Sequence, residues 1–139
     1  MPSGTEVGAD IRADIRVMGP SAIEEYYAHL LRLDRAKTFP DGAAIAAHCL
    51  SLISSGAILV GAYVDGVMRA AAEIVPDRTA RQAMAAITIE QGFDDRGFAR
   101  LLIERIINEA RRYHLSMLRV LEQSSIKNIR IEDAQVASG

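Results

Sequence analysis

The strongest constraint on the fold is a two-residue turn between two apolar segments. Asp65-Gly66 separates AILVGAYV (residues 57–64) from VMRAAAEIV (residues 67–75). Asp-Gly is favoured in a type I′ turn, because both central residues have positive φ and the twist of the turn matches that of paired strands. The sequence therefore predicts a β-hairpin and, with it, an antiparallel sheet.

A long amphipathic helix is expected over residues 97–114. Its apolar residues recur at three- and four-residue steps and form one face, namely Ala99, Leu102, Ile103, Ile106, Ala110 and Tyr113. Weaker patterns predict further helices at residues 19–34, 43–55 and 124–135, and further strands at residues 13–18, 84–90 and 115–122. The expected order is β-α-α-β-β-β-α-β-α, an α/β (α+β) fold without internal repeats.

Composition limits the class of protein. The chain has 139 residues, 50% of them hydrophobic, and a formal net charge of -2, so we expect one globular domain with no nucleic-acid or membrane partner. The single cysteine, Cys49, excludes an intramolecular disulfide and favours a cytoplasmic location, with a buried, unreactive thiol. No metal-ligand spacing is present. Residues 1–12 are interpreted as a flexible tail and residues 13–139 as the domain.

The turn before the long helix, FDDRGFAR (residues 93–100), has two interpretations. A helix N-terminus presents unpaired N–H groups and a positive dipole end that bind phosphate, and glycine allows a close approach. Aspartate in the same place also caps a helix by itself. The turn is neither a Walker loop nor a GxGxxG fingerprint, so the turn alone leaves both interpretations open.

In the context of its neighbours, the turn resembles a known family. The segment AAITIEQGFDDRGFARLLIERIINEAR (residues 85–111) is similar to the fourth strand, pyrophosphate loop and following helix of the GNAT N-acetyltransferases. YVDGVMRAAAEI and LRVLEQSSIKNI resemble the hairpin before that segment and the strand after it. The resemblance covers roughly Ile15 to Ile131 and implies a mixed, mostly antiparallel sheet flanked by helices.

The resemblance also implies a site and a reaction. The family loop, Gln/Arg-x-x-Gly-x-Gly/Ala, falls on Asp94, Asp95, Arg96, Gly97, Phe98 and Ala99, whose backbone amides would bind the pyrophosphate of acetyl-CoA. Ile87, Thr88 and Ile89 would hold the thioester through their backbone, and Gln123, where the family's last helix often begins, joins the cofactor-binding candidates. A substrate amine would attack the thioester directly, without metal or covalent intermediate.

Several residues depart from the family pattern. Asp94 replaces Gln or Arg and Asp95 a small residue, which brings two carboxylates to the pyrophosphate loop. Met84 stands where some members carry a catalytic glutamate, and Arg130 stands where a tyrosine acid is usual. Glu73 and Glu90 are the alternative bases, or else solvated strand-end charges.

Three functions remain open at this point. The chain is an acyl-CoA-dependent N-acyltransferase, a catalytically impaired relative that binds CoA or a partner, or a structural domain. The family pattern continues beyond the last helix to further strands, whereas this sequence stops at Gly139. From the open sheet edge expected there we predict a homodimer. The three histidines (His29, His48 and His114) and three tyrosines (Tyr26, Tyr27 and Tyr63) are interpreted mainly as packing or surface residues.

Overall fold

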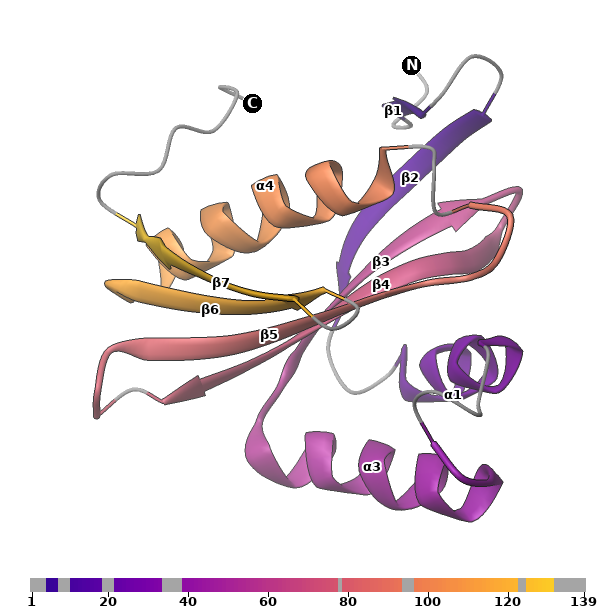
Figure 1. Cartoon of the computed structure of the whole chain (residues 1–139), viewed down its shortest axis with the longest axis horizontal. Coiled ribbons are helices and arrows are strands. Elements are labelled where there is room, and N and C mark those ends of the chain that lie inside the picture. The colour runs from indigo at the N-terminus through magenta and orange to yellow at the C-terminus, as the bar shows by residue number, and fades with distance from the viewer. Residues whose placement is uncertain are drawn as a thin grey trace.

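The chain folds into one sheet with helices on both faces (Figure 1). The computed structural model describes residues 5–7, 11–18, 22–33, 39–77, 79–93, 97–122 and 125–131. Within them, the strands are β1 (Thr5–Val7), β2 (Ile11–Met18), β3 (Ile58–Val64), β4 (Val67–Asp77), β5 (Gln82–Ile89), β6 (Met117–Glu122) and β7 (Ser125–Arg130). The helices are α1 (Ile23–Arg32), α3 (Gly42–Ser55) and α4 (Phe98–Arg112).

The seven described strands lie in the order β1-β2-β3-β4-β5-β6-β7. All neighbours are antiparallel except β5 and β6, which are parallel. A parallel pair needs a long crossover, and α4 supplies it. Figure 1 shows α4 over one face of the sheet, with α1 and α3 below the other. The mixed, mostly antiparallel fold expected from the sequence is confirmed.

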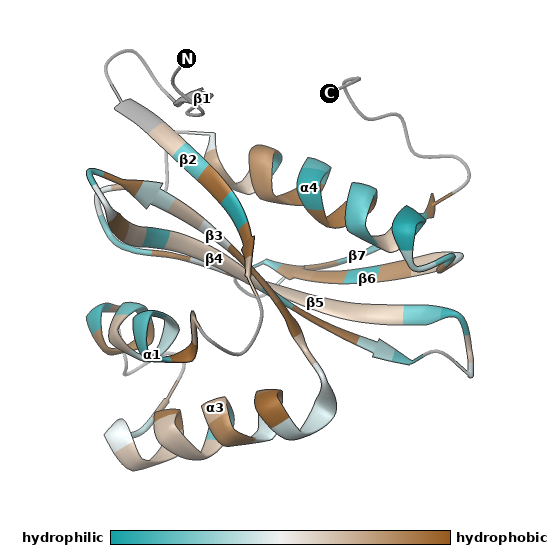
Figure 2. Cartoon of the chain, turned by 180° about the vertical axis from the view of Figure 1, so that it is seen from behind, coloured by the Kyte–Doolittle hydropathy of each residue, from teal (hydrophilic) through white to brown (hydrophobic). Residues whose placement is uncertain are grey.

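Each face of the sheet has its own apolar core. Phe98, Leu102 and Ile106 of α4 are fully buried against one face, while Tyr26 and Leu30 of α1 are buried against the other. Figure 2 shows the polar and apolar colours that alternate along α4, as an amphipathic surface helix requires, and the almost continuous apolar and neutral colours of α3. Cys49 is buried in the α1/α3 core, as predicted.

β5 and β6 separate before β5 ends. Their pairing stops at Ile87 opposite Glu122, whereas β5 continues along β4, with Thr88 opposite Ala71 and Ile89 opposite Ala70. The end of β5 therefore has a strand neighbour on only one side within the described residues. The separation is visible in Figure 1, where β6 ends near the middle of the sheet.

The predicted hairpin and long helix are confirmed. Asp65 and Gly66 have φ of 52° and 80°, and they join β3 to β4 as the positive-φ turn required. The helix predicted over residues 97–114 is α4.

Two predictions at the ends of the chain are wrong. Residues 125–130 form β7 instead of a helix, because Glu122 pairs with Ser125 and the chain returns at once along β6, which gives the buried strand a second hydrogen-bonding neighbour. The β6 edge expected to be open is thus paired, β7 forms the edge of the described sheet instead, and the homodimer stays a prediction. Within the predicted tail, Thr5–Val7 form β1 on β2, and β2 begins at Ile11 instead of Ala13.

Gly61 of β3 allows an aromatic ring to cross the strand. A Cβ at Gly61 would lie 2.8 Å from Cε1 of Tyr63 and 3.0 Å from the Met68 methyl carbon. Tyr63 is buried in the α1/α3 core and carries the Arg16 guanidinium 4.7 Å above its ring. The ring therefore has little room to move.

We predict that Gly61→Ala lowers the free energy of unfolding by about 1–3 kcal/mol through this overpacking, measured by urea denaturation. Gly42→Ala is the matched control, because its Cβ would meet only side-chain ends, the Tyr27 hydroxyl at 3.3 Å and Cδ2 of Leu31 at 3.9 Å, and should leave stability nearly unchanged. Wild-type stability in Gly61→Ala would contradict the prediction.

Candidate functional site

The first part of the site is the backbone at the end of β5. Glu90 donates its backbone N–H to the Arg69 carbonyl of β4 at 2.9 Å. Backbone groups alternate in direction along a strand, so those of Ile87 and Ile89 are directed toward β6. Because β6 pairing ends at Ile87, no described strand faces the N–H and C=O of Ile89. This edge offers a donor and an acceptor to an extended ligand.

The second part is the start of α4. Gly97 is its N-cap residue with φ 81°, a left-handed conformation that favours glycine, and it has no side chain to cap the first turn. Phe98 is fully buried and contacts Phe93 edge to face, with ring centroids 6.0 Å apart. Ala99 follows in the first turn. Asp94, Asp95, Arg96 and Gln123 lie outside the described residues.

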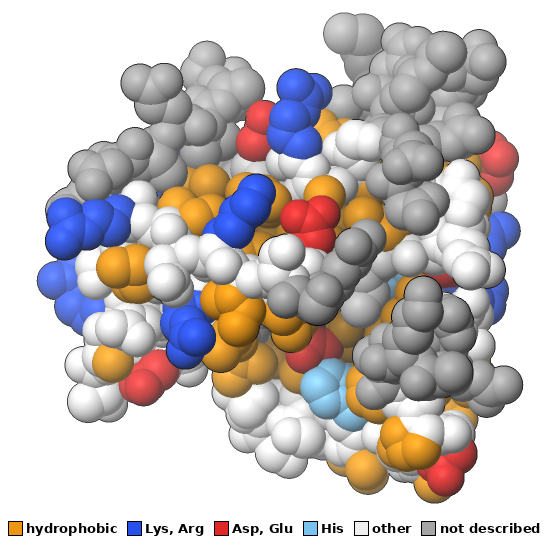
Figure 3. Space-filling view, in the orientation of Figure 1, with side chains coloured by type: hydrophobic (Ala, Val, Ile, Leu, Met, Phe, Trp, Pro, Cys, Tyr) orange, Lys and Arg blue, Asp and Glu red, His pale blue; other side chains and the backbone are white. Residues whose placement is uncertain are grey.

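The third part is a hydrogen-bonded group around Glu73, on the α1/α3 face. Its Oε2 accepts from the Tyr26 hydroxyl at 2.5 Å and contacts Nε2 of His48 at 2.8 Å. Glu73 is opposite Ala86, which places Cβ atoms about 5 Å apart, and Ala86 is one residue before β5 and β6 separate. Figure 3 shows a histidine beside a recessed acidic side chain between the sheet and α3.

The Glu73 carboxylate sets the proton affinities of its neighbours. Its hydrogen bond raises the pKa of His48, although partial burial acts in the opposite direction. Burial, with Glu73 beside it, raises the pKa of Tyr26 well above its ordinary value. Since Nε2 of His48 is directed to Glu73, Nδ1 is the nitrogen left to accept a proton. The side chain of His48 is 31% exposed, so a substrate can reach it.

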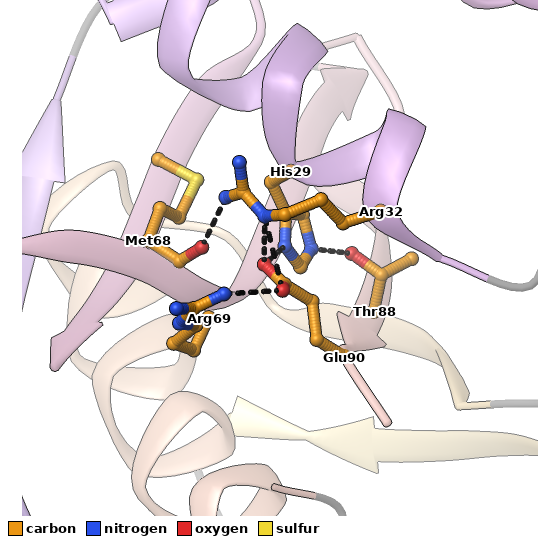
Figure 4. A network of polar contacts seen from close by, with 6 residues as sticks. All are labelled: His29, Arg32, Met68, Arg69, Thr88 and Glu90. Atoms are coloured by element: carbon orange, nitrogen blue, oxygen red, sulfur yellow. Dashed lines mark hydrogen bonds and ion pairs between the residues drawn. The ribbon is translucent and has the colours of Figure 1, made fainter. Parts of the chain in front are cut away.

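The fourth part is a buried ion cluster around Glu90 (Figure 4). Arg32 of α1 donates from Nε to both carboxylate oxygens at 3.0 Å, and Arg69 of β4 donates to Oε1 at 2.9 Å. His29 of α1 contacts Oε2 through Nδ1 at 3.0 Å. Arg32 also donates to the Met68 carbonyl at 2.8 Å, which attaches the end of α1 to β4.

The cluster keeps Glu90 ionised. Burial alone would raise the pKa of Glu90, but hydrogen bonds from His29, Arg69 and Arg32 together lower it below its ordinary value. With both oxygens already engaged, this carboxylate is poorly placed to accept a substrate proton. It is also 5% exposed, unlike a solvated strand-end charge. We therefore assign Glu90 to positioning.

Thr88 connects this cluster to the open edge of β5. Its Oγ1 lies 2.8 Å from Nε2 of His29, whose Nδ1 contacts Glu90. His29 is fully buried, and its ring lies 6.0 Å from that of Tyr26 in a stacked arrangement. Thr88 can therefore act in two ways: its backbone lies at the strand edge, and its hydroxyl contacts the imidazole of His29.

The structure brings some of the predicted site residues together, and their roles stay predictions. The structure brings Ile87, Thr88, Ile89 and the start of α4 to the place where β5 and β6 separate, and it places Glu73 beside them. The sequence missed Tyr26, His29, Arg32, His48 and Arg69 as polar partners. A histidine on the apolar face of a predicted helix, as at His29, is the one signal that indicated a buried polar partner.

Other classes of site receive no support from the described residues. They contain no group of three or more His, Cys, Asp or Glu side chains that could hold a metal ion. None of their helices has the length and apolar character that crossing a membrane requires.

Comparison with known proteins identifies the fold. No protein-family model and no curated protein sequence matches the chain. The GNAT domain of S. lividans PAT is similar over 84% of this chain and 76% of its own, with a TM-score of 0.69 and 15% identity. The aminoglycoside N-acetyltransferase AAC(6')-Iy in complex with CoA is similar over 84% and 80%, with a TM-score of 0.61 and 17% identity.

A third structure, ribosomal-protein-alanine N-acetyltransferase from Brucella melitensis, is similar over 79% of this chain and 80% of its own, with a TM-score of 0.62 and 19% identity. At such identities the likeness concerns the fold. The chain has the fold of the GNAT acetyltransferases.

Glu90→Gln tests the buried ion cluster. At about pH 7 we expect it to lower the free energy of unfolding by about 3 kcal/mol, because two guanidiniums lose their buried anion. The pKa of Glu90 is below its ordinary 4.5 in the folded protein. The carboxylate therefore stabilises the fold above about pH 4.5, and this contribution is lost as the pH falls through the folded-state value.

Urea unfolding at about pH 7 and about pH 3 measures the difference between wild type and variant, which should shrink at the lower pH. Glu24→Gln, at an exposed glutamate of α1, is the control and should change stability by less than about 0.5 kcal/mol. A difference that is the same at both pH values would contradict the assignment.

Proposed function

We propose that the protein is an acyl-CoA-dependent N-acyltransferase that uses acetyl-CoA and transfers the acyl group to an amine. The observation that carries the proposal is the open edge of β5 beside the uncapped start of α4. An extended pantetheine arm would pair with the backbone groups of Ile89, just beyond the last β5–β6 pair at Ile87, and the pyrophosphate would meet the first N–H groups of α4. The likeness to an N-acetyltransferase solved with CoA supports the same ligand.

The proposed reaction is direct attack of the amine on the thioester. The amine would approach over Ala86 on the α1/α3 face, because Ile87 and Ile89 present their side chains to the α4 core. Nδ1 of His48 would take the amine proton, while Glu73 holds the ring through Nε2 and Tyr26 holds Glu73. In this proposal Glu73 is a positioning residue. Met84, 44% exposed, offers no proton acceptor of its own.

The competing function is a CoA-binding protein without turnover. The observation that favours it is the pair of aspartates two and three residues before Gly97. A like-charge contact at about 4 Å costs about 1 kcal/mol in water and about 4 kcal/mol at an effective dielectric of 20. The pair would therefore weaken pyrophosphate binding without affecting the strand edge.

We predict that Asp94→Gln/Asp95→Gly binds acetyl-CoA roughly tenfold more tightly than the wild type, because tenfold corresponds to about 1.4 kcal/mol of removed repulsion. Calorimetric titration of both proteins measures the difference, and the gain should diminish at high salt. Asp77→Asn, an exposed aspartate at the distant end of β4, is the control. If neither protein binds acetyl-CoA, the proposed function is wrong.

The pH dependence of turnover tests His48. In a thiol-release assay with acetyl-CoA and a panel of amines, kcat/KM should rise as the pH passes a pKa above 6.5, because Glu73 raises the pKa of His48 and the base must be neutral. His48→Gln should reduce kcat by roughly 10²–10⁴-fold. Glu73→Gln should shift the rising limb toward lower pH, since the carboxylate that raises the pKa is gone.

His114→Gln is the matched control, because His114 is an exposed histidine beyond the far end of α4. Its profile should coincide with that of the wild type. A rising limb that stays in place in Glu73→Gln would exclude His48 as the base while leaving acyl transfer itself intact.

A further inference from the structure

A second chain of polar groups lies on the same face of the sheet and is not used by the amine-transfer reaction. It runs from the Thr88 hydroxyl to Nε2 of His29 at 2.8 Å, and from Nδ1 of His29 to Oε2 of Glu90 at 3.0 Å. The two contacts use the two different ring nitrogens. A hydroxyl, an imidazole and a carboxylate joined in this order are the arrangement that activates a nucleophilic oxygen.

The hydrogen positions in this chain follow from the carboxylate. Glu90 is ionised and therefore only accepts hydrogen bonds, so the His29 hydrogen on that side is at Nδ1. In the neutral imidazole Nε2 then carries a lone pair directed to Oγ1 of Thr88, a hydroxyl that also hydrogen-bonds the side chain of Tyr26. The stacked Tyr26 ring and complete burial hold the imidazole in this orientation. The chain is thus set to withdraw a proton from Thr88.

The position of Thr88 makes its hydroxyl available to an acyl group. Thr88 is the first residue of β5 beyond the last pair with β6 and is only half-buried, whereas His29 is enclosed. The next residue, Ile89, directs its backbone N–H to the open edge of the strand. A backbone donor beside a nucleophile can bind the oxyanion that forms during acyl transfer.

We propose that Thr88 is a nucleophile that takes acyl groups from thioesters and activated esters, which gives the protein an acyl-enzyme and hydrolase activity beside amine transfer. Oγ of Thr88 attacks the carbonyl carbon, and its proton passes to Nε2 of His29. The C–S bond breaks, and the thiolate leaves with the proton from His29. Water then attacks the acyl-threonine with His29 as base, which releases the carboxylic acid and restores the hydroxyl.

For acyl-CoA as donor, this inference rests on the proposed function. The test therefore includes an activated ester that needs no CoA site. The protein is mixed with p-nitrophenyl acetate, and separately with acetyl-CoA, without amine; the reaction is quenched in acid and the acylated peptide is found by mass spectrometry. We expect one acetyl group on the peptide that contains Thr88, and a burst of p-nitrophenol before slow turnover.

Two pairs of variants test whether acetylation of Thr88 depends on the chain of Thr88, His29 and Glu90. Thr88→Val should lose the label, whereas Thr88→Ser, which keeps the hydroxyl, should retain it. His29→Gln should slow the acylation of Thr88 by roughly 10²-fold or more, whereas His48→Gln should acylate Thr88 like the wild type while losing amine transfer. This last variant separates the two proton acceptors in one protein.

The outcomes distinguish the two proposals. Acetyl-Thr88 from p-nitrophenyl acetate supports the nucleophile even if acetyl-CoA does not bind, in which case the proposed function falls alone. Amine acetylation from acetyl-CoA without any label on Thr88, from either donor, would overturn the nucleophile and leave the proposed function in place. A label that forms equally fast in His29→Gln would also overturn it.

Discussion

The arrangement of the site depends on a carboxylate that has been removed from water. Glu90 directly follows β5, the strand with the open edge, and an unpaired buried ion there would cost several kcal/mol. Its partners come from two elements, His29 and Arg32 from α1 and Arg69 from β4. Satisfying one charge therefore fixes α1 against the sheet, and with it the imidazole that meets Thr88.

The same cluster extends toward the start of α4. The guanidinium of Arg69 lies 5.3 Å from the centre of the Phe93 ring, and Phe93 packs edge to face on Phe98, the first residue of α4. Phe93 also donates its backbone N–H to the Glu90 carbonyl at 3.1 Å. The backbone edge, the helix start and the imidazole are thus joined by one continuous set of contacts, an arrangement that favours preorganised binding of an extended ligand.

Local patterns in the sequence predicted most helices and strands. The last strand and the polar contacts of the site depend on residues far apart in the chain, which these patterns do not show. The hairpin at Asp65-Gly66, α4 and the role of Ile87–Ile89 as a strand beside it follow from turn chemistry and periodicity, which are local. The sequence analysis predicted a helix where β7 forms. Residues 125–130 become a strand because they pair with β6, and this pairing cannot be recognised from the pattern of those residues alone. The contacts of Glu90 with α1 join residues about sixty positions apart in the chain, and no short-range pattern indicates them.

Two glutamates on the same face of the sheet therefore have different roles because their neighbours differ. Glu90 meets two guanidiniums as well as an imidazole, so it is held as an anion and can only orient His29. Glu73 meets a phenol and a partly exposed imidazole, and no guanidinium among its described partners, so it raises the pKa of His48 and contacts that ring through Nε2, not Nδ1. The two residues are of the same type, so it is the surroundings of each carboxylate that determine its role. Between them on β5, the partly buried Ala86 presents only a methyl group, and in the proposed reaction the acyl group and the amine would meet over it.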